Sequence, residues 1–350
     1  MNPLHLIALA ARTPVGLDIE GTAAAVRAGI SRIGLHPCIA DRLGANLLSA
    51  IDGRLDPTLL GWQRLPELAM PVLTEVFRKL GSAFRPARPV PVLLALPEAR
   101  PGFHDVNARE VVSKIQAGAR ALDLPVEVEV VARGHAGGLA AIAAAADSSE
   151  RRWDDVFIVG GVDSYFDFDT LDWLQEHRQI KTDQTRNAFV PGEAACFVAL
   201  ARDELRRALR LPSLGVVRAV GSAREDKLIK TDAINLGEGL RHAIASALAP
   251  LRTPAELVDD VYCDINGERY RMEEWGFALV ALPHAFREGA YMTPADRIGD
   301  VGAASGTLFC SLAAQSWSRH YASGPRALCW GSSESGLRVA ALVERAAEGR

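Results

Sequence analysis

The chain has 350 residues and a formal net charge of -4; 49% of its residues are hydrophobic but only 6% are aromatic. A chain of this length can bury a substantial core, which here must be aliphatic and rich in alanine. The mild acidity gives no support for nucleic acid or an anionic membrane as a partner. Residues 1–16 lack a basic segment, and no stretch offers about 18 uncharged apolar residues, so we expect a soluble cytoplasmic protein.

The cysteines are scattered and show no CxxC spacing, which argues against the usual zinc and redox sites. Their odd number, in a chain whose start has no signal-peptide pattern, favours reduced thiols. Most of them lie in apolar runs, where packing explains them better than chemistry. We therefore predict no metal and no cofactor. These residues are Cys38, Cys196, Cys263, Cys310 and Cys329.

Strand and helix patterns alternate along the first part of the chain. An apolar strand at 4–11 leads into a turn at 13–16, and a stretch at 31–62 rich in glycine and proline is expected to be irregular. Asn107 is predicted as the N-cap of a helix, with Glu110 in the capping-box position. The other predicted strands are 91–96, 155–159 and 195–201, and the predicted helices are 20–29, 65–80, 107–122 and 171–179.

The stretch 126–147 is the one around which the chain is organised. It begins as a β-rich run in which Glu127 and Glu129 alternate with valines, a pattern typical of an edge strand. It then turns through Arg-Gly-His-Ala-Gly-Gly and continues from Gly137 as an alanine-rich helix that we expect to be deeply buried. The turn places His135 at a helix N-terminus, where unpaired backbone N–H groups favour negative charge. The local sequence by itself favours a histidine that caps or packs.

The alternation starts again after a basic stretch at 202–210 and a proline-containing stretch at 211–213, which we expect to form a hinge. Such alternation predicts an α/β fold with mostly parallel strands. Because both parts of the chain show this alternation of strands and helices, we suspect an old duplication, with halves at 1–210 and 211–350. In the second half the predicted strands are 214–220, 258–265, 327–330 and 339–343, and the predicted helices are 236–248, 271–282 and 307–318.

Five motifs in order along the chain resemble the β-ketoacyl synthases of the thiolase superfamily. They are LIALAARTPVG, FIVGGVDSYFD, NAFVPGEAACFVALA, GDVGAASG and ALCWGSSESGLRVAALV. The resemblance covers nearly the whole chain and implies a five-layer α-β-α-β-α thiolase fold built from two duplicated halves, each of which supplies one mixed sheet. It also implies a homodimer formed through the edge strand at 126–131. Glu193 matches the family's Gly-Glu-Gly or Gly-Glu-Ala turn, where we expect a structural carboxylate.

The catalytic positions of that family are replaced in this sequence. When this sequence is aligned with the family pattern, His135 stands at the position of the nucleophilic cysteine. Asn266 and Asp300 stand at the positions of the two histidines. Decarboxylative condensation needs a thiolate of lowered pKa and two imidazole donors on the malonyl carbonyl. An acyl group on imidazole hydrolyses readily, and an aspartate repels a carboxylate substrate. We therefore predict that this protein does not perform Cys-dependent condensation.

Each of the three residues also has a structural interpretation. His135 would hold its turn by donating to a neighbouring carbonyl, and Asn266 would complete the turn at the end of a strand. Asp300 would cap the helix that follows it or pair with Arg297 or Arg269.

Three functions follow from the resemblance and the replacements. Shortened thiolase-like proteins without the cysteine resemble accessory proteins found beside type VI secretion components, which implies a scaffold, adaptor or chaperone that helps load an effector. The second function is a noncanonical acyl-transfer or acyl-thioester processing enzyme that uses His135 on acyl carrier protein or coenzyme A thioesters. The third is a chain-length-factor-like partner of an active synthase. The corresponding protein partner would be an effector, a carrier protein or a synthase.

Overall fold

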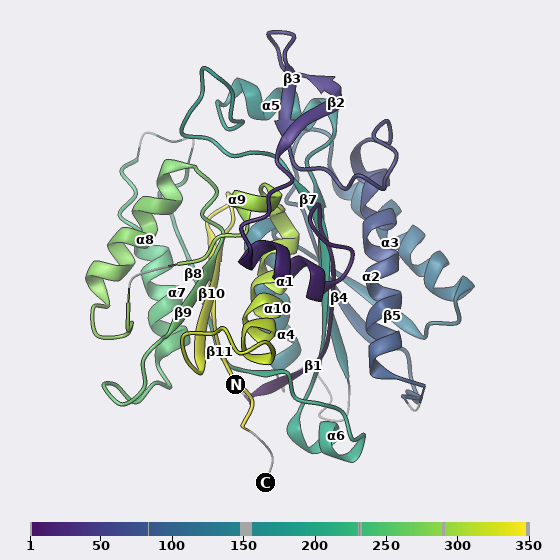
Figure 1. Ribbon diagram of the computed structural model, residues 1–350, viewed down its shortest axis with the longest axis vertical. Helices are drawn as coiled ribbons and strands as arrows, with labels where there is room; N and C mark the ends of the chain where they lie inside the picture. Colours follow the sequence, from purple (N-terminus) through teal and green to yellow (C-terminus); the bar gives the residue numbers. More distant parts are fainter. Residues whose placement is uncertain are drawn as a thin grey trace.

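The computed structural model describes residues 2–82, 84–147, 156–229, 231, 233–288 and 291–347. Its elements form layers in the order helix, sheet, helix, sheet, helix (Figure 1). The layering is the α/β thiolase arrangement that the resemblance implied. The outer helices are α2 (Arg64–Leu80) and α3 (Asp105–Ala121) on one side and α7 (Glu238–Leu248) and α8 (Arg269–Ala281) on the other; the central helices are α4 (Gly137–Ala146) and α10 (Ser305–Ser318), with α1 (Ile19–Arg27) beside α10.

The strands follow the order β5-β4-β6-β7-β1-β8-β11-β10-β9. The first five come from residues before 202 and the last four from residues after 214. The strands are β1 (Leu4–Arg12), β4 (Val90–Leu96), β5 (Val126–Ala132), β6 (Phe157–Ser164), β7 (Glu193–Ala201), β8 (Gly215–Arg224), β9 (Asp260–Cys263), β10 (Arg326–Ser332) and β11 (Leu337–Glu344).

We expected each half to supply a sheet of its own, but a short ladder joins the two. Residues 4–6 of β1 pair with residues 215–217 of β8, so hydrogen bonding runs through one nine-stranded sheet. The side chains of Leu4 and Leu6 are fully buried, and the ladder gives partners to backbone groups that would otherwise be buried without them. Elsewhere the central helices separate the two parts of the sheet (Figure 1).

The expectation of mostly parallel strands was wrong. β4 pairs in parallel with β5 and β6, and β9 pairs in parallel with β10. The other five pairings described in the large sheet are antiparallel. A helix between two strands permits a parallel crossover but does not require one, and β10 returns directly as β11 through a short turn.

The two central helices pack against each other through glycines. A Cβ atom on Gly138 would lie 3.0 Å from the backbone nitrogen of Thr307, and one on Gly306 would lie 2.8 Å from that of Leu139. Only glycine permits this approach, because the neighbouring atoms belong to the backbone and cannot move aside. Most of α4 is buried, which confirms the burial predicted for the helix from Gly137.

Several element boundaries differ from the prediction. The stretch 31–62 contains a hairpin of β2 (Gly34–Ala40) and β3 (Asn46–Ser49), and the expected hinge at 202–210 contains the short helix α6 (Asp203–Ala208). The N-cap of α3 is His104, not Asn107, whose side chain instead accepts from the His104 N–H at 2.8 Å. The strand predicted at 155–159 begins at Phe157, and residue 155 itself lies outside the described part of the chain.

β5 lies at one edge of the sheet, as its alternating valines and glutamates predicted. Glu127 and Glu129 are exposed, whereas Val126, Val128 and Val131 are half-buried. Its outer edge is open to a further strand. None of the helices in the described ranges is long and apolar enough to cross a membrane.

Candidate functional site

The site begins where β5 ends. The chain passes through Arg133 into a single 3₁₀ turn, η2 (Gly134–Ala136), and from there directly into α4. Gly134 has a φ of +55°, which glycine adopts without strain. The turn points the side chain of His135 inward, where only 9% of it is exposed.

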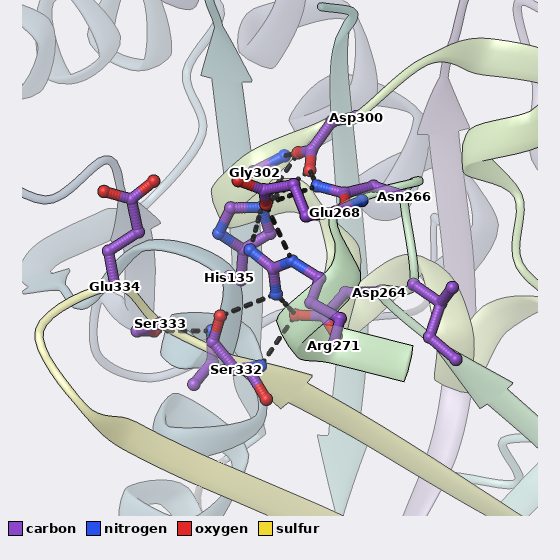
Figure 2. Close-up of polar contacts among 12 residues, drawn as sticks. His135, Asp264, Asn266, Glu268, Arg271, Asp300, Gly302, Ser332, Ser333 and Glu334 are labelled. Atoms are coloured by element: carbon purple, nitrogen blue, oxygen red, sulfur yellow. Dashed lines mark hydrogen bonds and ion pairs between the residues drawn. The ribbon is translucent and has the colours of Figure 1, made fainter. Parts of the chain in front are cut away.

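His135, Asn266 and Asp300 meet at one point, as the resemblance predicted (Figure 2). The Nε2 atom of His135 lies 2.9 Å from Oδ1 of Asp300, and Nδ2 of Asn266 donates to Oδ2 of Asp300 at 2.5 Å. Asn266 follows β9, and Asp300 follows the short helix α9 (Ala295–Ile298). Asn266 also accepts from the backbone N–H of Glu268 at 3.0 Å, so it completes the turn after the strand as expected.

The carboxylate of Asp300 has two further donors. The hydroxyl of Tyr165 donates to Oδ1 at 3.0 Å, and the backbone N–H of Gly302 donates to the same oxygen at 2.8 Å. Because both oxygens already accept hydrogen bonds from the protein, this carboxylate has little capacity left for a substrate.

Of the two roles expected for Asp300, its side chain accepts from the N–H of Gly302, the first residue of the 3₁₀ turn η3 (Gly302–Ala304) that leads into α10, whereas the expected pairing with Arg297 or Arg269 is wrong. Arg269 pairs with Glu273 at 2.6 Å, and the Arg297 guanidinium donates to the backbone oxygen of Asp296. The backbone of Asp300 exchanges hydrogen bonds with the chain around residues 190–192, and its side chain points inward toward His135. The expected carbonyl partner of His135 is likewise replaced by this carboxylate.

Burial disfavours the charged forms of both partners, but their mutual attraction outweighs it. Desolvation lowers the pKa of His135 and the nearby charge of Asp300 raises it, with a net increase. Desolvation raises the pKa of Asp300, yet the charge and hydrogen bond of His135 bring it well below its usual range. The pair therefore stabilises imidazolium beside carboxylate, with the Nε2 proton directed at Asp300.

Arg271 adds a second buried cation beside His135, one that the sequence analysis did not predict. Its guanidinium donates to Asp264 at 2.5 Å, to Glu268 at 3.2 Å and to the backbone oxygen of Ser332 at 2.8 Å (Figure 2). A terminal nitrogen of Arg271 lies 3.4 Å from Nε2 of His135. A lone arginine in a helical segment is ordinarily solvated, so the sequence offered no signal that this one is fully buried.

Backbone groups of the turn also have hydrogen-bond partners within the protein. The N–H of Ala136 donates to the hydroxyl oxygen of Ser333 at 3.0 Å, and that hydroxyl in turn donates to the backbone oxygen of Arg133. An N–H at this position would otherwise be free to stabilise developing negative charge. Here it serves to fasten the turn to the segment after β10.

A cavity of about 260 Å³ adjoins His135. Arg100 on its wall donates to Asp163 at 2.8 Å and to the backbone oxygen of Ser164 at 2.9 Å, while its Nε has no partner among the described residues. The second ring nitrogen of His135 faces away from Asp300 (Figure 2). The cavity is lined by Glu98, Ala99, Arg100, Gly134, His135, Asp163, Tyr165, Trp173, Leu174, Glu334 and Ser335.

No cysteine lines this cavity. Burial raises the pKa of the Cys196 thiol to about 12 and raises those of Cys263 and Cys329 well above their usual range. Cys310 is buried within α10, as expected, and Cys38 is exposed in β2. Within the described ranges, no group of three or more histidine, cysteine or acidic side chains is arranged to hold a metal ion.

Glu193 lies in a separate, fully buried cluster. Arg64 binds it with two hydrogen bonds of 2.7 and 2.6 Å, and neither side chain has any exposed surface. The hydroxyl of Ser164 donates to it at 2.9 Å and the backbone N–H of Asp52 at 2.8 Å. This is the structural carboxylate that the sequence predicted.

No protein-family profile and no curated protein matches this sequence. Many solved structures share its fold. The ishigamide ketosynthase/chain length factor matches with a TM-score of 0.70 at 19% identity, covering 99% of this chain and 100% of that one. A complex of a type II PKS acyl-carrier protein with its ketosynthase bound to the hexaketide matches with a TM-score of 0.77 at 13% identity, covering 99% and 100%.

The ketosynthase from module 6 of the bacillaene synthase of Bacillus subtilis 168 matches with a TM-score of 0.75 at 13% identity, covering 99% of this chain and 72% of that one. Identities this low establish the fold and leave the activity open. The chain has the thiolase-like fold of the ketosynthases.

Proposed function

We propose that this protein is a ketosynthase-like scaffold without Cys-dependent condensing activity, and that it acts by binding other proteins. One observation carries the proposal. The residues at the three catalytic positions bond to each other: Asp300 accepts from both His135 and Asn266, and Tyr165 and the Gly302 N–H engage it as well.

Condensation requires a reactive nucleophile and donors aimed at a substrate carbonyl. In this site the nucleophile position holds an imidazole whose proton is directed at a carboxylate, and one of the histidine positions holds that carboxylate. Ionised Asp300 can only accept hydrogen bonds, so it cannot stabilise an oxyanion. Loss of a nucleophile costs several orders of magnitude in rate, and loss of one oxyanion donor costs about a hundredfold.

The test is an assay of malonyl-thioester decarboxylation and of condensation with an acyl thioester, run with and without iodoacetamide. We expect no turnover above the uncatalysed rate in either case. Cys38, the exposed cysteine, will be alkylated without consequence. Turnover that disappears when a single cysteine is alkylated would contradict the proposal.

An adaptor or chaperone that loads a type VI secretion effector is the specific scaffold role that we propose. The open edge of β5 supports a protein-binding role, because a homodimer or a partner strand can pair there. A chain-length-factor-like role is the alternative scaffold function. Purification of the tagged protein from its native host separates the two: an effector or secretion-spike protein supports the first, and a ketosynthase supports the second.

The cavity beside His135 favours acyl-thioester processing as a second candidate function. A histidine oriented by a buried carboxylate, with its other nitrogen turned away from that carboxylate, is the geometry of a general base or nucleophile. The raised pKa of His135 opposes this, because an imidazolium has no lone pair to offer.

Mass spectrometry after incubation with acyl thioesters tests this candidate. An acyl adduct or hydrolysis that persists in alkylated protein and disappears in His135→Ala would favour the enzyme. The matched control is His177→Ala, because His177 is exposed and lies outside the cavity lining.

A further inference from the structure

The outward side of helix α8 is apolar. The helix lies on the outside of the molecule (Figure 1), and its inward side, with Trp275, belongs to a buried cluster. A helix at a protein surface ordinarily turns polar side chains to water. Here Met272, Phe277 and Val280 are 46%, 43% and 81% exposed, and residues 275–283 include no charged residue.

Two neighbouring segments extend this apolar surface. A hydrogen bond of 2.6 Å from the side chain of Asn235 to α8 fixes a segment whose Ile234 and Leu236 are 78% and 46% exposed. On a second segment, Tyr291 is 37% exposed and donates its hydroxyl to the sulfur of Met272 at 3.1 Å. We call the combined surface the α8 face; it consists of Ile234, Leu236, Met272, Phe277, Val280 and Tyr291.

Gly276 lies in the middle of the α8 face, one helical turn from both Met272 and Val280, and is exposed. Glycine inside a helix lowers its stability relative to alanine. A Cβ atom here would meet nothing within 4 Å in the described part of the chain beyond its own helix, so intramolecular packing does not require a glycine. Glycine does permit a second backbone to approach closely, as Gly138 and Gly306 permit between the central helices.

The α8 face is large enough for the centre of a stable interface. At roughly 150 Å² for each large apolar side chain, the exposed fractions of its six members amount to about 500 Å². Each partner of a standard interface buries about 800 Å², with an apolar centre and a polar rim. The α8 face thus supplies more than half of that area, and polar residues around it can supply the rest.

We infer that the α8 face binds the α8 face of a second copy of this chain. In a twofold contact, residue i of one copy meets residue j of the other, and j meets i. With two antiparallel α8 helices crossing at Gly276, Met272 of each copy lies opposite Val280 of the other, because both are four residues from the crossing point.

The charges on α8 are compatible with this pairing. Arg269 and Glu273 form an ion pair of 2.6 Å with each other at the N-terminal end of the exposed side. In the antiparallel arrangement this end faces the uncharged residues 279–283 of the second copy, so like charges do not meet across the axis. Both side chains are exposed enough to keep their charged groups in water at the rim.

The α8 face is separate from the open edge of β5. β5 is the first strand in the order of the sheet, whereas α8 packs on α7, which covers β8 and β11 in the other half. The inference therefore adds a second surface for self-association and does not depend on the proposed scaffold role. The condensation assay and the experiments on α8 can fail independently.

The first test is sedimentation velocity of the full chain over a range of micromolar concentrations. We expect the wild type to self-associate. Val280→Glu places an unpaired carboxylate in the contact of each copy and should raise the dissociation constant about a hundredfold or more. Gly276→Leu should leave the fold intact, because the space around Gly276 is open, and yet raise the constant about tenfold by separating the helices.

The matched control is Val106→Glu, because Val106 is a 54% exposed valine on the outer helix α3, in the opposite outer layer. This variant should associate like the wild type. Circular dichroism should show all three variants folded, so that a loss of association is not a loss of structure.

Disulfide trapping tests the crossing point itself. In a Cys38→Ser background, which removes the exposed native thiol, Gly276→Cys should form a covalent dimer under mild oxidation, because the two copies of residue 276 meet at the axis. Ser113→Cys, on the exposed side of α3, is the control and should stay monomeric on a denaturing gel.

Several results would overturn the inference. A wild type that stays monomeric is one, even if Val280→Glu then loses a different protein in pull-downs from the native host, since that protein would be the occupant of the α8 face. Another is equal association of the wild type and Val280→Glu, as expected of a dimer formed only through the edge of β5. Equal trapping at residues 276 and 113 is a third.

Discussion

Two buried carboxylates in this protein, Glu193 and Asp300, each accept hydrogen bonds from four donor atoms, yet their surroundings differ. Glu193 faces Arg64, a permanent cation, and the pair has no exposed surface. Asp300 faces His135, a cation that can lose its proton and that lines a cavity. Both carboxylates are far from bulk water, so each depends on its partner for stability.

The difference lies in what each cluster can do when its partner is lost. At pH 7 a glutamate takes up a proton only at a cost of about 3–4 kcal/mol, whereas a histidine gives one up at almost no cost. The Glu193 cluster therefore serves the fold. The charge of the Asp300 cluster varies with pH. A ligand or partner that binds beside the cluster can change this charge as well.

The largest effect should come from Arg64→Met, which leaves Glu193 buried without its cation. We expect the free energy of unfolding to fall by about 3–5 kcal/mol in urea denaturation. Arg42→Met is the control, because Arg42 forms an exposed ion pair with Asp172, and its denaturation midpoint should stay unchanged. A loss in Arg64→Met no larger than in the control would remove the contrast between the clusters.

Asp300→Asn should destabilise the protein less, by about 2 kcal/mol at pH 7. The asparagine keeps the shape of the side chain, and His135 can respond by releasing its proton. Urea denaturation of this variant beside Arg64→Met measures the difference directly. Equal losses of stability in the two variants would mean that release of the His135 proton does not reduce the cost of removing the Asp300 charge.

The Asp300 cluster should also make stability depend on pH. The pKa of His135 is raised in the folded protein, so the stability it adds is fully present below about 6.5 and is lost as pH rises through the folded pKa. The stability of the wild type relative to His135→Gln should therefore decrease above pH 6.5, by at most about 1.4 kcal/mol per pH unit. A difference that stays constant from pH 6 to 9 contradicts this assignment.

The smallest effect should come from Ser333→Ala, which frees the N–H of Ala136 and the backbone oxygen of Arg133. We expect a loss of about 1–2 kcal/mol, because the N–H of Ala136 is left without this partner in a buried position. Ser335→Ala is the control, because its hydroxyl is exposed and water can replace its bond to Glu98. If the two variants lose the same stability, the turn is not fastened through Ser333.

Much of the fold was within reach of the sequence. The order of motifs predicted the layers, and the composition of the helix from Gly137 predicted its burial, because close packing on all sides needs small side chains. The direction of the strands could not be predicted from the sequence, because helix–strand alternation is compatible with both parallel and antiparallel pairing. The halves 1–210 and 211–350 stay a prediction. The turns at Gly134 and Gly302 have similar φ values, +55° and +48°, as a duplication would leave them.

The site was predicted in part. The meeting of His135, Asn266 and Asp300 came from the resemblance, because the fold fixes where those positions lie. The hydrogen-bond partners of these three residues could not be predicted in this way. Arg271 and Tyr165 reach the cluster from other elements, and no local pattern distinguishes a buried charged or hydroxyl group from a solvated one. The roles of the three residues remain predictions that the proposed assays test.

The ladder between β1 and β8 has a consequence for how the molecule comes apart. Three residue pairs contribute little to holding the two parts of the sheet together. The central helices hold them instead: α4 packs on β4 and β6 of its own half and on β8 and β11 of the other, while α10 packs on β1, β6 and β7 as well as β9 and β10. The buried cluster around the two helices therefore draws on both halves, although each half also has a smaller cluster of its own, and separating the halves would expose both helices at once. The chain should therefore melt in a single cooperative transition, and a fragment ending near residue 210 should not fold alone.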